Sequence, residues 1–114
     1  MLSILEKRNI KFKKKFFLFK ETIKSVETID FDMQFISALY EQQLKNVIND
    51  IELALNNEYE KIDDPWINNK YDEFALITPN CIEYYDEKNQ KYDITCSLED
   101  FRELTTLWKN FLGV

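Results

Sequence analysis

Glycine occurs once in the 114 residues, at Gly113, and histidine does not occur at all. Phosphate-cradling loops, dinucleotide-binding turns and nucleophile elbows need glycine where the backbone turns tightly. The lack of histidine removes the commonest general base and the commonest metal ligand. Two cysteines, Cys81 and Cys96, are too few for a structural zinc site, and no acidic loop carries the glycine of a calcium-binding EF-hand. The sequence therefore predicts a protein that is not an enzyme and that binds no cofactor or metal.

Length and composition indicate a single folded domain over residues 1–114. Apolar residues make up 45% and aromatic residues 15% of the chain, which is too much for a disordered protein. No apolar run approaches the roughly 20 residues of a membrane span. Charged residues follow Leu2, Ile4 and Leu5 at once, without a signal-peptide cleavage site, so we expect a cytoplasmic protein without a membrane partner.

The N-terminal segment fits a helix better than a strand. Ser3 and Glu6 match a capping box. The apolar residues then repeat at three and four, with Asn9 in the remaining slot: Leu5, Phe12, Phe16, Phe19, Ile23 and Val26. The segment also fits a strand whose one face holds Ile10, Phe12, Phe16 and Leu18. Lys14 breaks that alternation and the helical repeat runs longer, so we predict a first helix that ends before Thr28.

A second helix is predicted from Phe31 to Leu55, with Asp30 as its N-cap. Its apolar stripe consists of Phe31, Phe35, Leu39, Leu44, Val47, Ile48, Ile51 and Leu55. Residues 1–57 are therefore expected to be helical. Residues 58–73 form a connector without regular period, and Pro65 disfavours helix at the residue before it, so this connector is predicted to be a loop.

Three short antiparallel strands are predicted within residues 74–96, at Phe74–Ile77, Ile82–Tyr85 and Tyr92–Cys96. A three-residue loop with Asn89 in the left-handed conformation would pair Tyr84 with Tyr92 and Ile82 with Ile94. One face then holds Ile82, Tyr84, Tyr92, Ile94 and Cys96, and the other holds Cys81, Glu83, Tyr85, Lys91, Asp93 and Thr95. A two-residue loop would mix apolar and polar residues on each face, so we expect the three-residue loop.

The last helix is predicted over residues 97–113, capped by Ser97 and closed by Gly113. Its inward residues are Leu98, Phe101, Leu104, Trp108, Phe111 and Leu112. The predicted fold is therefore α+β: two N-terminal helices, a small three-stranded antiparallel sheet and a C-terminal helix, with the helices on one face of the sheet.

Charge divides the chain into two unequal parts. Residues 1–24 hold eight basic and two acidic residues, a net charge of +6. The remaining 90 residues hold seven of the 15 bases and 19 of the 21 acids, a net charge of −12. The lysine run can be a solvated helix face or a nucleic-acid footprint. Because the phenylalanines fit a buried helical register and the acidic remainder would repel a polyanion, we expect no nucleic-acid partner.

The acidic part offers the better candidate for recognition of a protein. Aromatic rings lie among like charges in the connector, an arrangement in which charge steers the encounter and rings anchor the complex. Trp66 can be such an anchor or can fill the edge of the core. The predicted partner-binding residues are Glu58, Tyr59, Glu60, Asp63, Asp64, Trp66, Tyr71, Asp72 and Glu73 in the connector, with Glu83 and Tyr85 on the polar hairpin face.

The segment "CIEYYDEKNQKYDITCSLEDFRELTTLWKNFL", Cys81 to Leu112, has a layout of strand, turn, strand and capped helix with a late tryptophan. In a small, acidic, single-domain chain this layout resembles immunity proteins of bacterial polymorphic toxins, of the contact-dependent growth-inhibition type. The resemblance implies a protein that binds a cognate toxin domain, often a basic nuclease, and neutralises it by occluding its active or substrate-binding surface. It implies no catalytic residues, and it assigns no interface positions. We expect the protein to be a monomer in the complex.

Three hypotheses follow from the sequence. The first is a stoichiometric inhibitor, either an immunity protein or a phage-type inhibitor of a host enzyme that binds nucleic acid. The second is a nucleic-acid-binding accessory protein that uses residues 11–24. The third is a structural or adaptor subunit.

Overall fold

The protein is an α+β fold in a computed structural model that describes residues 1–16 and 22–114. The elements in these residues are α1 (Ile4–Lys7), β1 (Lys11–Phe16), β2 (Thr22–Glu27), α2 (Phe31–Ser37), α3 (Glu41–Leu55), the 3-10 helix η1 (Tyr59–Lys61), β3 (Trp66–Asn68), β4 (Phe74–Ile77), β5 (Cys81–Tyr85), β6 (Lys91–Ser97) and α4 (Leu98–Leu112). Strands β1 and β2 form a two-stranded antiparallel ribbon, and β3-β4-β5-β6 form a four-stranded antiparallel sheet. The predicted α+β class is confirmed, whereas the predicted three-stranded sheet and two N-terminal helices are wrong.

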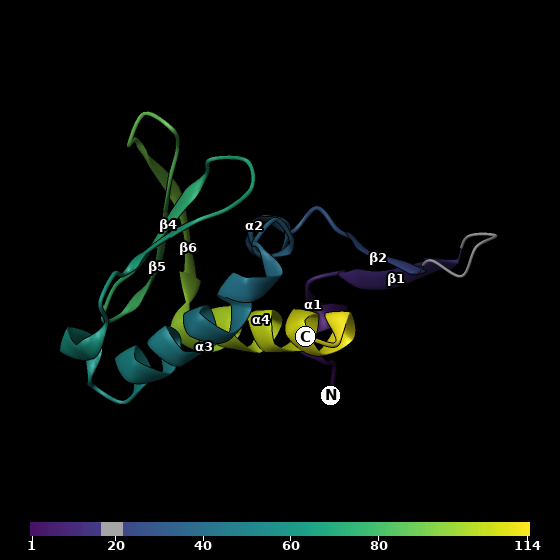
Figure 1. The fold of residues 1–114 in the computed structure, drawn as a ribbon, viewed down its shortest axis with the longest axis horizontal. Helices are drawn as coiled ribbons and strands as arrows, with labels where there is room; N and C mark the ends of the chain where they lie inside the picture. Colours follow the sequence, from purple (N-terminus) through teal and green to yellow (C-terminus); the bar gives the residue numbers. More distant parts are fainter. Residues whose placement is uncertain (17–21) are drawn as a thin grey trace.

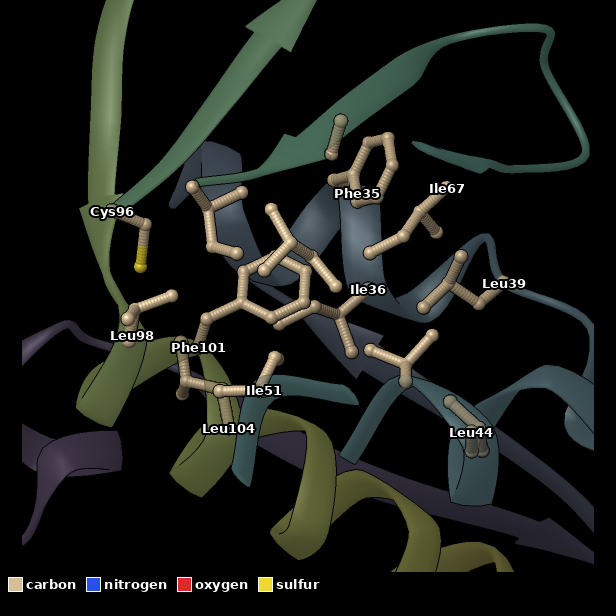
Figure 2. Packing of buried hydrophobic residues seen from close by; sticks show 14 of the residues in the cluster. Phe35, Ile36, Leu39, Leu44, Ile51, Ile67, Cys96, Leu98, Phe101 and Leu104 are labelled. Atoms are coloured by element: carbon tan, nitrogen blue, oxygen red, sulfur yellow. The ribbon is translucent and has the colours of Figure 1, made fainter. Parts of the chain in front are cut away.

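Helices α2, α3 and α4 lie against one face of the four-stranded sheet, and the core fills the space between them (Figures 1 and 2). The strands contribute the buried residues Ile67, Ala75, Ile77, Ile82, Tyr84 and Cys96. The helices contribute Met33, Phe35, Ile36, Leu44, Ile51, Leu98, Phe101 and Leu104. The β1–β2 ribbon projects from the other side of the helices, so the sheet and the ribbon lie at opposite ends of the molecule's longest axis, which measures 48 Å (Figure 1).

The predicted N-terminal helix is a single turn followed by the ribbon. The predicted capping box is present, because the Ser3 hydroxyl accepts from the Glu6 amide and the Glu6 carboxylate accepts from the Ser3 amide. Asn9 then adopts a left-handed conformation with φ of 55°, and asparagine in this position is a common way to end a helix. The chain leaves α1 as strand β1, so the strand alternative that the sequence also allowed is the correct one. Predicted positions Leu18 and Phe19 lie outside the described residues.

Lys14, which breaks the apolar alternation of the strand, has a partner on the inner face of the ribbon. Phe12 packs against the rings of Trp108 and Phe111 near the end of α4, with centroids 5.3 and 5.0 Å apart. Lys14 extends along the same surface and places its amine 5.7 Å from the centre of the Phe111 ring. Lysine can bury its stem and hold its charge over an aromatic face. The ribbon is therefore stabilised by aromatic residues that are distant in the sequence.

The predicted second helix is divided into α2 and α3. The carbonyl of Ala38, which would continue the helix by accepting from residue 42, instead accepts from the amide of Lys70 at 2.9 Å. Gln43 supports the new helix start, because its side chain accepts from the Tyr40 amide at 2.8 Å and donates to the Asn68 carbonyl at 2.9 Å. The apolar stripe continues across this break, so the periodicity alone predicted one helix.

The predicted loop over residues 58–73 contains η1 and β3. Strand β3 is only three residues long, too short to show a period, and it adds a fourth strand to the sheet. Its entry is fixed by the Pro65 carbonyl, which accepts from the Ile77 amide at 2.9 Å. The predicted bounds of β4, Phe74–Ile77, are confirmed.

The loop between β5 and β6 has the predicted three residues, and Asn89 has the predicted left-handed conformation with φ of 61°. Tyr85 pairs with Lys91, as that loop requires. Further along, a bulge shifts the register by two, so Ile82 pairs with Cys96 and the predicted Ile82–Ile94 pair is wrong. A shift of two keeps every side chain on its face. Ile94, which was predicted to lie on the apolar face, is nevertheless 44% exposed.

Arg8 joins the N-terminal segment to α2 and α4. Its guanidinium binds the carboxylates of Asp30, Asp32 and Asp100 at 3.1, 2.6 and 2.9 Å. Asp30 is also the predicted N-cap of α2, and Asp32 accepts a 2.5 Å hydrogen bond from the buried hydroxyl of Tyr84 in β5. Burial acts to lower the pKa of Arg8, but the hydrogen bonds to Asp32 and Asp100 outweigh it and raise the pKa above its usual value.

The predicted C-terminal helix is confirmed as α4. The Ser97 hydroxyl accepts from the Asp100 amide at 3.1 Å, and Gly113 closes the helix in the left-handed conformation with φ of 78°.

The two thiols are predicted to react at different rates. Cys81 and Cys96 pair with Ser97 and Ile82, respectively, so they lie on opposite faces of the sheet and cannot form a disulfide without backbone movement. Burial, and then the charge of Asp32, raises the pKa of Cys96, whereas Cys81 is half-buried. Titration of native, unreduced protein with a thiol reagent should show a fast thiol that Cys81→Ser removes, and a second thiol only after unfolding. An intramolecular disulfide in that sample would contradict the sheet register.

Candidate protein-binding face of the sheet

The face of the four-stranded sheet that points away from the core is covered by none of the described helices (Figure 1). Its side chains form two cross-strand rows, given by the strand pairing. The first row is Trp66, Leu76, Glu83 and Thr95, and the second is Asn68, Phe74, Tyr85 and Lys91. We call these eight residues the outer sheet face. Apart from Asn68, its residues from β3 and β4 are apolar or aromatic, and its residues from β6 are polar.

Trp66 is a surface residue of this face and does not fill the core. Its side chain is 44% exposed, and its ring packs edge-on against Tyr85 with centroids 5.1 Å apart. The backbone beneath it is fixed, because the Trp66 amide donates to the Asp64 carboxylate at 3.0 Å and Pro65 is bonded to β4. The ring is therefore held in place before any partner binds. Tyr85 in turn donates its hydroxyl to Glu83 at 3.2 Å.

Three carboxylates gather beside Trp66. A hollow of about 270 Å³ lies between α3 and β3, lined by Gln42, Gln43, Asn46, Val47, Asp50, Asp64, Trp66 and Ile67. Burial, and then the negative charges of Asp63 and Asp64, raise the pKa of Asp50 above its usual value. Within the described residues, no ion pair involves Asp50, Asp63 or Asp64. The edge of the outer sheet face thus carries mutually repelling negative charge next to an exposed indole.

Tyr71, Asp72 and Glu73 lie at the opposite end of β3, in the turn that leads to β4. Buried Asn69 organises this turn, because its side-chain oxygen accepts from the amides of Tyr71 and Glu73 and its amide group donates to the Glu73 carboxylate. Together with the β5–β6 turn these residues line a second hollow of about 380 Å³. This turn is therefore separate from the Trp66 region.

Glu58, Tyr59 and Glu60 belong to the η1 segment, where Tyr59 has a structural role. The Tyr59 hydroxyl donates to the Ile77 carbonyl at 2.7 Å, and its ring packs against the core. Glu58 forms an ion pair with Lys61. The eleven predicted residues thus fall into three groups, and the structure brings together five of them: Asp63, Asp64, Trp66, Glu83 and Tyr85.

Sequence reasoning missed Asp50, Phe74 and Leu76. The two apolar residues follow from the alternation of β4, in which Ala75 and Ile77 are buried and Phe74 and Leu76 point to the other side. This signal was readable once a strand was predicted. Asp50 lies on α3, away from the acidic connector, and only the tertiary packing places it near Asp63 and Asp64, so no local signal identifies it.

Comparisons with protein-family models, with curated protein sequences and with solved structures found no match to this chain. None of the helices in residues 1–16 and 22–114 is long and apolar enough to cross a membrane. The same residues contain no cluster of three or more cysteine, aspartate or glutamate side chains placed to hold a metal ion.

Replacing Asp50 with asparagine is predicted to stabilise the protein at neutral pH. A raised folded-state pKa means that the charged form is disfavoured in the folded protein, so removing the charge helps wherever Asp50 would be ionised. The gain should be present at pH 7, by up to about 1 kcal/mol in the free energy of unfolding, should fall as the pH drops through about 4, and should disappear below about pH 3, where the carboxyl is neutral in both states. Denaturant titrations at the highest and lowest of these pH values test this.

Glu52→Gln is the matched control, since Glu52 is an exposed acid on the same helix. The same pH-dependent gain in Glu52→Gln would show that general charge reduction, and not the cluster around Asp50, is responsible.

Proposed function

We propose that the protein is a stoichiometric inhibitor that binds a basic protein partner through the Trp66 edge of its outer sheet face. The observation that carries this proposal is a half-exposed indole, fixed by backbone bonds and by Tyr85, beside three carboxylates that have no cationic partner within the described chain. Rigid aromatic anchors at the centre of an interface contribute most of its binding energy.

Charge complementarity supports a basic partner. Three close carboxylates repel one another in the free protein, and a lysine or arginine side chain from a partner would relieve that repulsion when it enters the hollow between α3 and β3. Charges at the rim of an interface chiefly accelerate association, by steering the partner toward the surface. The acidic residues and Trp66 would therefore act on different steps of binding.

The resemblance of residues 81–112 to immunity proteins supports a toxin domain as the partner, in the bacterial cytoplasm. This segment forms β5, β6 and α4, and it supplies Glu83 and Tyr85 to the outer sheet face. Occlusion of a basic nuclease surface by the aromatic sheet face and the carboxylates at its Trp66 edge would require no catalytic group, cofactor or metal. One inhibitor monomer would bind one toxin domain.

Charge and aromatic substitutions are predicted to separate association from dissociation when tested with the protein encoded beside this gene. Asp63→Asn with Asp64→Asn should slow association at low salt, with a smaller effect at high salt, because steering is screened. Trp66→Ala should increase the dissociation rate by a factor equivalent to about 2 kcal/mol or more and leave the salt dependence unchanged. Surface plasmon resonance at several salt concentrations measures both rates.

Tyr71→Ala is the matched control, because Tyr71 is a more exposed aromatic, at 76%, in the turn at the other end of β3. It should leave both rates unchanged, and the melting temperature of each variant excludes general unfolding. Equal effects of Tyr71→Ala and Trp66→Ala would contradict the assigned interface. Absence of binding to the neighbouring gene product at any salt concentration would contradict the immunity function itself.

A further inference from the structure

The β1–β2 ribbon presents a row of lysines on its outer face. Lys11, Lys13 and Lys15 alternate along β1, so their side chains point to the same side, opposite to Phe12 and Lys14. All three are exposed. Their cross-strand partners are Glu27, Ser25 and Ile23, and Lys13 forms an ion pair with Glu27. Within the described parts of the ribbon, five lysines stand against one glutamate.

The other face of the ribbon is the one that holds it to the body. Phe12 packs on Trp108 and Phe111, and Lys24 donates to the Leu112 carbonyl at 3.1 Å at the end of α4. The amine of Lys24 also lies 5.8 Å from the centre of the Phe111 ring. The lysine row is consequently not used for packing, and its orientation away from the body is fixed by the opposite face.

The position of the ribbon separates it from the acidic surface. The ribbon and the four-stranded sheet lie at opposite ends of the 48 Å axis (Figure 1). Charges in water are largely screened beyond about 8 Å at physiological ionic strength. The repulsion from the acids at the sheet end therefore acts weakly at the ribbon, and the buried helical register that also opposed a nucleic-acid partner is not present.

We propose that the outer face of the β1–β2 ribbon binds the phosphodiester backbone of nucleic acid, independently of base sequence. Alternate residues of a strand are about 6.7 Å apart, so the three lysines form a straight row of positive charge that a linear polyanion can follow. A two-stranded ribbon also has dimensions that the major groove of DNA admits. This binding site is separate from the outer sheet face and does not depend on the function proposed for that face.

The row of lysines is a better match for a linear polyanion than for a bilayer. Peripheral binding to membranes combines basic residues with a sizeable apolar surface that enters the lipid. On the lysine face the described apolar residue is Ile23, which is 48% exposed, at one end of the row. Within the described part of the lysine face, the charges are thus not accompanied by such a surface, and exposed Phe16 belongs to the opposite face, with Phe12.

The expected binding is weak and strongly dependent on salt. Because Lys13 is already paired with Glu27, the row would neutralise two to three phosphates, which gives a slope of log K against log salt concentration of about −1.8 to −2.7 for duplex DNA and about −1.4 to −2.1 for single strands. Non-specific affinities of this kind fall at dissociation constants of roughly 10⁻⁴ to 10⁻⁶ M at physiological salt. Fluorescence anisotropy with a labelled 20-base-pair duplex and a labelled 20-nucleotide single strand, each of mixed sequence, measures both quantities.

The decisive variant is the triple change Lys11→Gln, Lys13→Gln, Lys15→Gln. It should reduce the affinity at low salt by at least tenfold and bring the slope close to zero, whereas the protein should keep its melting temperature because these side chains are exposed. The matched control changes three exposed lysines elsewhere, Lys45, Lys70 and Lys88, to glutamine. It removes the same charge and should leave binding within twofold of the original protein.

Equal losses in the two triple variants would overturn the proposal, because net charge and not the lysine row would then govern binding. A slope of magnitude below one for the original protein would also overturn it. A titration with vesicles of phosphatidylcholine and phosphatidylserine tests the alternative partner, a membrane surface. Tight binding to these vesicles with no binding to either DNA would assign the ribbon to a membrane surface instead.

Discussion

One guanidinium group joins the parts of this protein that are far apart in the sequence. Arg8 leaves the short helix α1 and binds carboxylates in α2 and α4, and one of these, Asp32, also binds the Tyr84 hydroxyl inside the sheet. Three carboxylates would repel one another without the cation, and a partly buried cation would lack compensation without them. The Arg8 cluster thereby fixes the position of the chain after α1 relative to the first turns of α2 and α4.

This junction has a functional consequence, because it holds two surfaces of opposite charge at opposite ends of one small domain. The Trp66 edge of the outer sheet face, with Asp50, Asp63 and Asp64 beside it, is the proposed site for a basic protein, and the lysine row of the ribbon is the proposed site for a phosphate backbone. A toxin nuclease and its nucleic-acid substrate have these two chemistries. The two proposed surfaces lie at opposite ends of the molecule's 48 Å longest axis, and exposed charges in physiological salt act over about 8 Å, so neither surface should disturb the other.

Features that depend on one residue and its neighbours could be predicted from the sequence, whereas features that depend on contacts between distant residues could not. The turn at Asn89 and the helix end at Gly113 were predicted correctly, because both positions need a left-handed backbone conformation, which asparagine and glycine adopt readily. The helix predicted for the ribbon segment is wrong, because the strand accommodates Lys14 by holding its amine over the Phe111 ring. That ring lies almost one hundred residues later in the sequence. The break between α2 and α3 depends on the amide of Lys70, and the acidic cluster depends on Asp50, which only packing brings to Asp63 and Asp64.

The free energy of unfolding of an Arg8→Met variant tests the junction most directly, with Lys7→Met as the control for an exposed neighbouring cation. Removing one partner of a buried ion pair costs about 3 kcal/mol, and because this cluster is partly exposed we expect a loss of about 2 kcal/mol, whereas a surface substitution changes stability by less than about 0.5 kcal/mol. Adding Asp32→Asn to Arg8→Met should restore part of the loss, because it removes a carboxylate left without its cation. An Arg8→Met protein as stable as Lys7→Met, or a double variant whose losses simply add, would contradict the account.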